Sequence, residues 1–111
     1  MARVPTTFDP FNAVAEPKRR QLLEALGPTE RFVNEIAGAL GWPQPMVSKH
    51  LAVLKKVGLV RERREGRLRL YRLNAEKLKP IHDWITPFAR YWSESFDRLD
   101  DVLESLQKKE G

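Results

Sequence analysis

Two stretches between Asn34 and Gly58 carry the apolar spacing of short helices joined by a tight turn. The first stretch ends at Gly41, because glycine readily takes the left-handed conformation that terminates helices. The second is predicted to be a helix over residues 44–57. Its apolar side chains recur at intervals of four, three and three residues: Val47, Leu51, Leu54 and Val57.

The side of the second helix opposite this stripe is small, polar and positive: Pro45, Ser48, Lys49, Ala52 and Lys56. These residues suit a DNA groove better than a protein core. A helix–turn–helix places its second helix in the major groove, with N-terminal residues against the base edges. We therefore interpret residues 34–58 as a helix–turn–helix. The alternative is a pair of core helices in an ordinary bundle.

Residues 59–73 alternate with a period of two, which predicts two strands with Glu65-Gly66 as the hairpin turn. A short basic hairpin directly after a helix–turn–helix is a wing. The alternative is a hairpin whose charges only keep a free sheet edge soluble. The concentration of arginines favours the wing: Arg61, Arg63, Arg64, Arg67 and Arg69.

Two helices are predicted ahead of this unit. Asp9 is the expected cap of the first, with Pro10 at its first position. Glu16-Pro17 interrupts the chain, because proline disfavours a helical conformation in the residue before it. The second helix then covers residues 18–26.

Asn74 is the expected cap of a further helix over residues 75–85. Thr86-Pro87 repeats the cap-then-proline signature and predicts a break, with a kinked continuous helix as the alternative. The last helix carries apolar residues in a heptad-like seam: Phe88, Trp92, Phe96, Leu99, Leu103 and Leu106.

A small winged-helix core cannot cover a helix of about 30 Å along its whole length. We therefore expect the seam to meet its copy in a homodimer, with packing inside one chain as the alternative. The residues expected at this interface are Phe11, Trp84, Phe88, Trp92, Phe96, Leu99 and Leu103.

The chain of 111 residues is expected to form a single domain, 1–111, with a DNA-binding core at 9–73 and dimerisation helices at 75–108. The fold class is mainly α-helical with a small β-hairpin, that of a winged helix–turn–helix. The net charge is +5, and residues 49–72 hold nine Lys and Arg against two Glu. A partner that is a polyanion fits this distribution.

The sequence holds no cysteine, which excludes disulfides, thiolate metal sites and cysteine nucleophiles. No apolar run approaches a membrane span and no signal peptide is evident, so a cytoplasmic location is expected. His82-Asp83 stands alone, and no metal site, cofactor or enzymatic activity is predicted. A site for a small apolar effector between the last two predicted helices is kept as an alternative.

The segments FNAVAEPKRRQLLEAL, VNEIAGALGWPQPMVSKHLAVLKKVGLV and REGRLRLYRLN resemble the ArsR family of bacterial winged helix–turn–helix repressors. The resemblance implies a homodimer on a palindromic operator. Many members release DNA when a metal binds. The metal-binding cysteine box of the family aligns here with FVNEIAG, which has no cysteine, so metal sensing is not carried over.

By this resemblance Gln44, Ser48, Lys49 and His50 match the recognition segment. The residues expected to contact double-stranded DNA are Gln44, Pro45, Ser48, Lys49, His50, Lys55, Arg63, Arg64, Arg67 and Arg69. The alternative function is a winged-helix protein-interaction module without specific DNA binding.

Overall fold

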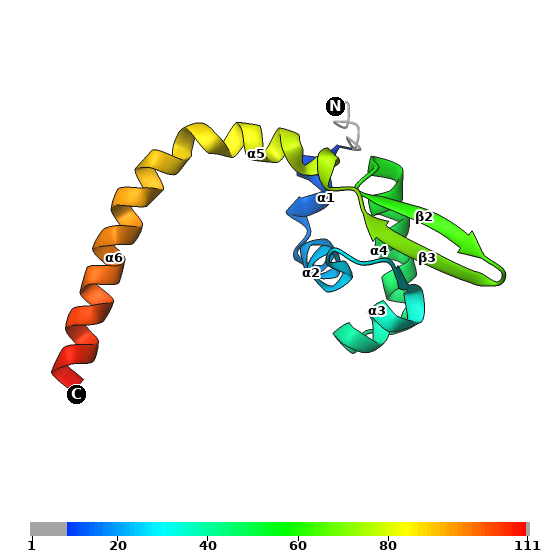
Figure 1. Ribbon diagram of the computed structural model, residues 1–111, viewed down its shortest axis with the longest axis horizontal. Coiled ribbons are helices and arrows are strands. Elements are labelled where there is room, and N and C mark those ends of the chain that lie inside the picture. The colour runs from blue at the N-terminus through cyan, green and yellow to red at the C-terminus, as the bar shows by residue number, and fades with distance from the viewer. Residues whose placement is uncertain (1–8, 111) are drawn as a thin grey trace, which may run out of the picture. The chain divides into compact units, whose positions relative to one another are not determined.

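The computed structural model describes residues 9–110, without the side chains of residues 93–97, 100 and 107–110 in the last helix. The chain divides into two compact units, residues 1–80 and 81–111. The first unit holds α1, α2, β1, α3, α4, β2, β3 and a 3₁₀ helix (Figure 1). Their bounds are Pro10–Ala15, Pro17–Leu26, Arg31–Phe32, Val33–Leu40, Gln44–Val57, Val60–Glu65, Leu68–Leu73 and Ala75–Leu78.

The helix starts of the N-terminal half follow the capping chemistry of the sequence. The Asp9 carboxylate accepts a hydrogen bond from the Asn12 N–H at 2.8 Å, which satisfies one of the unpaired amides of α1. At the start of α2, the Glu16 carboxylate likewise accepts a hydrogen bond from the Lys18 N–H at 3.2 Å. The predicted interruption at Glu16-Pro17 is confirmed.

The predicted helix–turn–helix is confirmed, and α4 has the predicted bounds. Gly41 ends α3 with φ 69°, and Gly58 ends α4 with φ 89°. The Pro43 side chain cannot cap α4, so its carbonyl accepts from the Met46 and Val47 N–H groups at 3.1 and 3.3 Å. The apolar stripe of α4 anchors the core, because Val47, Leu51 and Leu54 are fully buried.

The hydrophobic core joins α4 to α1, α2, α3 and the root of the hairpin. Its largest fully buried side chains are Leu22, Leu26, Ile36, Val47, Leu51, Leu54, Leu59 and Val60. At about 25 cal/mol per Å² of apolar surface, each such side chain contributes roughly 1.5–3 kcal/mol to the free energy of unfolding. This core fixes the position of α4 beneath the hairpin.

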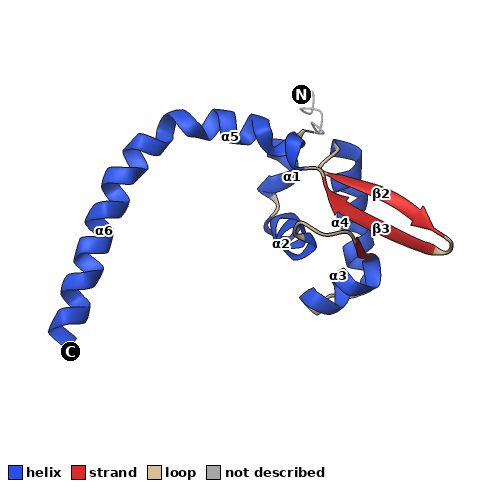
Figure 2. Ribbon diagram, in the orientation of Figure 1, coloured by secondary structure: helices blue, strands red, loops and turns tan. Residues whose placement is uncertain are grey.

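The hairpin belongs to a three-stranded antiparallel sheet of order β1-β3-β2, shown in red in Figure 2. The short strand β1 was not predicted from the sequence. Glu65 pairs with Leu68, so the two-residue turn is Gly66-Arg67 and begins one residue later than predicted. Gly66 has φ 60°, as the first central residue of a type II′ turn requires.

The expected cap at Asn74 is wrong. Asn74 does stand at the N-cap position before Ala75, but its side chain makes no cap hydrogen bond and instead donates through Nδ2 to the Gly58 carbonyl at 2.9 Å. This contact ties the end of β3 to the end of α4. The chain enters a 3₁₀ helix at Ala75 before α5 (Lys79–Ile85) begins.

The second unit is helical and contains most of α5, a 3₁₀ turn (Thr86–Phe88) and α6 (Ala89–Glu110). Ile85 and Ala89 both keep right-handed helical angles, so the expected break is a tightening to one 3₁₀ turn. Thr86 does not cap α6, because its hydroxyl donates backwards to the His82 carbonyl at 2.6 Å. Within the described residues, no helix is long and apolar enough to cross a membrane.

Candidate nucleic-acid interface

The outward side of α4 carries the residues that the sequence predicts for DNA contact. Gln44, Pro45 and Lys49 are exposed, and Ser48 is half-buried. The Gln44 Nε2 donates to the Ser48 Oγ at 2.9 Å, across one turn of the helix. The two polar side chains therefore form one hydrogen-bonded pair in the first turns of α4.

A hollow of about 360 Å³ separates this part of α4 from the wing, the β2–β3 hairpin. Figure 1 shows the wing beside α4 in the same unit. The hollow is lined by Val33, Gln44, Ser48, Ala52, Lys55, Glu62, Arg69 and Tyr71. The fold thus brings predicted residues of the helix and of the wing to one surface.

A second hollow, of about 190 Å³, continues this surface toward the wing turn. Its lining brings Gln44 together with Arg67, Leu68 and Arg69, which come some 25 residues later in the sequence. Arg67 is exposed in the turn itself. The N-terminal end of α4 and the tip of the wing therefore share one basic face.

A carboxylate that sequence reasoning missed lies in the larger hollow. Glu62 is opposite Tyr71 in the ladder and accepts through Oε2 from the Lys55 Nζ and the Tyr71 hydroxyl, both at 3.0 Å. The Arg64 Nε is 3.7 Å from the other oxygen. The hydrogen bond from Lys55 is the main reason why the pKa of Glu62 lies below its usual 4.5. The period of two puts Glu62 on the side of β2 that carries buried Val60, and Glu65 on the other side, but the sequence does not show that Lys55 and Tyr71 meet Glu62.

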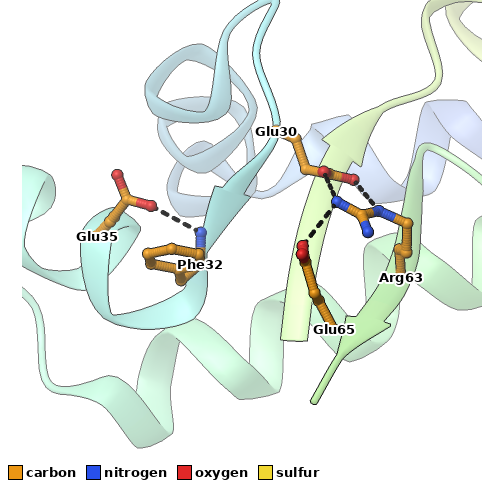
Figure 3. Close-up of polar contacts among 5 residues, drawn as sticks. All are labelled: Glu30, Phe32, Glu35, Arg63 and Glu65. Atoms are coloured by element: carbon orange, nitrogen blue, oxygen red, sulfur yellow. Dashed lines mark hydrogen bonds and ion pairs between the residues drawn. The ribbon is translucent and has the colours of Figure 1, made fainter. Parts of the chain in front are cut away.

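Arg63 lies on the opposite face of the wing from this hollow. Its Nη2 and Nε contact Glu30 at 2.6 and 3.2 Å, and Nη2 is 3.3 Å from Glu65 (Figure 3). The Arg63 guanidinium lowers the pKa of Glu30, mainly through this hydrogen bond. The structure therefore separates Arg63 from the other predicted DNA-contact residues, because adjacent residues of a strand point to opposite faces.

The same figure shows how β1 leads into α3. The Glu35 carboxylate accepts a hydrogen bond from the Phe32 N–H at 3.2 Å (Figure 3). This backbone amide at the start of α3 therefore has a hydrogen-bond partner. Phe32 pairs with Leu70 of β3. This connection holds α3 and the sheet together on the side of α4 that carries Gln44.

His50 lies on the flank of α4, half-buried, and lines neither hollow. Its ring is 6.4 Å from the Trp42 ring, and its buried Nδ1 has no hydrogen-bond partner among the described residues. Burial, followed by the charge of Arg19, lowers its pKa below 6.5. The structure thus gives His50 a packing position.

The predicted dimer residues of the second unit present a row of exposed apolar side chains: Trp84, Phe88, Trp92, Leu99 and Leu103. Phe11, in the first unit, is 41% exposed. The side chain of Phe96 lies outside the described residues. Within the described part of the chain, no three His, Asp or Glu side chains gather in a group that could hold a metal ion.

Residues 16–62 match the family model described as "Bacterial regulatory protein, arsR family". The regulator KmtR of Mycobacterium tuberculosis is 42% identical over 64% of this chain and 55% of its own length, so the match spans about half of that relative. The regulator Rv2034 of the same species is 32% identical over 86% of each chain.

A solved structure, the homodimeric winged helix–turn–helix DNA-binding domain Mb0332 of Mycobacterium bovis, is similar with a TM-score of 0.60. It is 34% identical, and the similarity covers 77% of this chain and 79% of that one. The winged helix–turn–helix predicted from the sequence is thereby confirmed. The chain belongs to the ArsR family of bacterial regulatory proteins.

Proposed function

We propose that the protein is a sequence-specific DNA-binding transcription regulator that acts as a homodimeric repressor on a palindromic operator. One observation carries this proposal: the polar side of α4 and the basic tip of the wing form one continuous surface. α4 would enter the major groove, and the wing would lie against the adjacent backbone or minor groove.

The roles on this surface divide by chemistry. Gln44 and Ser48 are polar, uncharged groups in the first turns of α4, where side chains meet base edges. Lys49, Lys55, Arg64, Arg67 and Arg69 are cations suited to phosphates, which fix position without reading sequence. Arg63 is left out of the proposed contact surface, because Glu30 and Glu65 hold it on the other face of the wing.

The proposed dimer rests on the second unit. Trp92, Leu99 and Leu103 are between 41% and 52% exposed on a helix whose other residues are largely charged. Rows of large apolar side chains of this kind mark interaction surfaces. A second copy of the chain is the partner proposed, as in the homodimeric Mb0332 domain.

Footprinting on the DNA upstream of its own gene tests the proposal. We expect protection of a site with two inverted half-sites, separated by about one helical turn or a multiple of it. Protection at a single half-site, or none at protein concentrations that saturate non-specific binding, would contradict a palindromic operator.

A further inference from the structure

Glu62 is an acid on a surface that otherwise suits a polyanion. Its side chain is only 12% exposed, in the hollow between α4 and the wing. The other charged residues that line this hollow are cations, Lys55 from α4 and Arg69 from β3. A DNA backbone that passes between a helix in the major groove and a wing in the next groove would approach this hollow.

The contacts of Glu62 resemble those of a bound phosphate oxygen. Oε2 accepts from an ammonium and a hydroxyl at 3.0 Å each, and Oε1 is 3.7 Å from the Arg64 guanidinium. Lysine, arginine and tyrosine are among the side chains that proteins use to contact DNA phosphates. In the structure, a carboxylate of the chain itself accepts from these donors.

We propose that Glu62 acts as an intramolecular phosphate mimic, which occupies Lys55 in the free protein and lowers its sequence-independent affinity for DNA. The inference rests on the proposed function of this surface. Two effects would lower the affinity for DNA. A phosphate must displace Glu62 from Lys55, and the displaced carboxylate then repels the phosphate in a partly closed, weakly screened hollow.

The pairing of Glu62 with Lys55 should change how the affinity for DNA depends on salt concentration. A lysine that stays paired with a carboxylate neutralises no DNA phosphate and releases no condensed counterion, so it contributes little to the salt slope. One further phosphate contact steepens the slope of log K against log salt by about 0.9. Extrapolated from 1 M salt, that slope corresponds to about eightfold tighter binding at 0.1 M salt.

The test uses Glu62→Gln on a duplex of arbitrary sequence, so it needs no knowledge of the operator. Glutamine keeps an acceptor oxygen for Lys55 and Tyr71 and removes only the charge. Glu24→Gln is the matched control, because Glu24 is an exposed acid of α2 outside the hollow and its neutralisation changes the net charge equally. Circular dichroism verifies that each variant is folded.

We expect Glu62→Gln to bind about eightfold more tightly at 0.1 M salt and to steepen the slope by about 0.9, while Glu24→Gln matches the wild type. In a Lys55→Gln background, Glu62→Gln should no longer steepen the slope. An unchanged slope, or weaker binding by folded Glu62→Gln, would overturn the proposal and leave Glu62 a structural link. Wild-type protein without salt-dependent binding would instead refute the proposed function.

Discussion

The amide of Gln44 and the hydroxyl of Ser48 are joined by a hydrogen bond of 2.9 Å on the outward side of α4. This hydrogen bond holds the Gln44 side chain in one orientation in the absence of a ligand. Without it, the side chain would sample several rotamers. A polar side chain held in this way loses less conformational entropy when it meets a base edge. The pair is therefore the strongest candidate for sequence reading in this chain.

Gln44→Ala should cost about 1–3 kcal/mol of binding free energy on the cognate operator and little on a scrambled duplex. The reason is that base-edge contacts exist only on the correct sequence. Titration of both duplexes at one salt concentration measures the difference. Gln21→Ala, at an exposed position of α2, is the control and should change neither. An equal loss on both duplexes would remove Gln44 from sequence reading.

Arg67→Ala should weaken binding to both duplexes to a similar degree and flatten the salt slope by about 0.9, as expected for one lost phosphate contact. Arg67 is exposed in the wing turn, next to the N-terminal end of α4. Arg63→Ala supplies the contrast, because Glu30 and Glu65 already hold that guanidinium on the other face. A slope that responds to Arg63 rather than to Arg67 would reverse the assignment of the two faces.

His50 should make the stability of the protein depend on pH. Its folded-state pKa is below 6.5, chiefly because burial disfavours the charged ring, so the unfolded chain binds the proton more readily. Its contribution to stability is therefore present above pH 6.5 and lost as pH falls toward the folded-state pKa. Urea unfolding between neutral and mildly acidic pH should show this loss. His50→Gln should flatten the curve there, and an identical curve would contradict the assignment.

Leu99→Glu should convert the proposed dimer to a monomer without loss of helicity, because it puts a charge into the apolar row of α6. Leu99 is 52% exposed in the single chain. Light scattering at micromolar concentration gives the mass. Asp101→Ala, at an exposed position on another side of α6, should leave the proposed dimer intact. A wild-type monomer with full helicity would refute the proposed interface.

The bounds of α4 were predictable from the sequence because both ends depend on local chemistry. Pro43 and Pro45 fit only the start of a helix, and Gly58 supplies the left-handed residue at its end. The apolar stripe between them fixes which side is buried. Such signals lie within a few residues of the feature that they determine.

The features that sequence reasoning missed depend on distant partners. The strand β1 has two residues, too few for a periodic pattern, and exists because Arg31 and Phe32 pair with Tyr71 and Leu70. Strand alternation already puts Arg63 and Arg64 on opposite faces of β2, but the sequence does not show that Glu30, 33 positions away, pairs with Arg63. The alternation of β2 puts Glu62 and Glu65 on opposite faces of the wing, but only the structure shows that Lys55 of α4 packs against Glu62.

We expect the surface formed by α4 and the wing to bind DNA and to read its sequence. The most direct measurement is a titration of the wild-type protein on its footprinted upstream site and on a scrambled duplex at several salt concentrations. The logarithm of the binding constant for each duplex should fall linearly with the logarithm of the salt concentration, and the specific site should be bound at least about 10³-fold more tightly at physiological salt. Equal affinity for the two duplexes, or binding that does not respond to salt, would contradict this expectation.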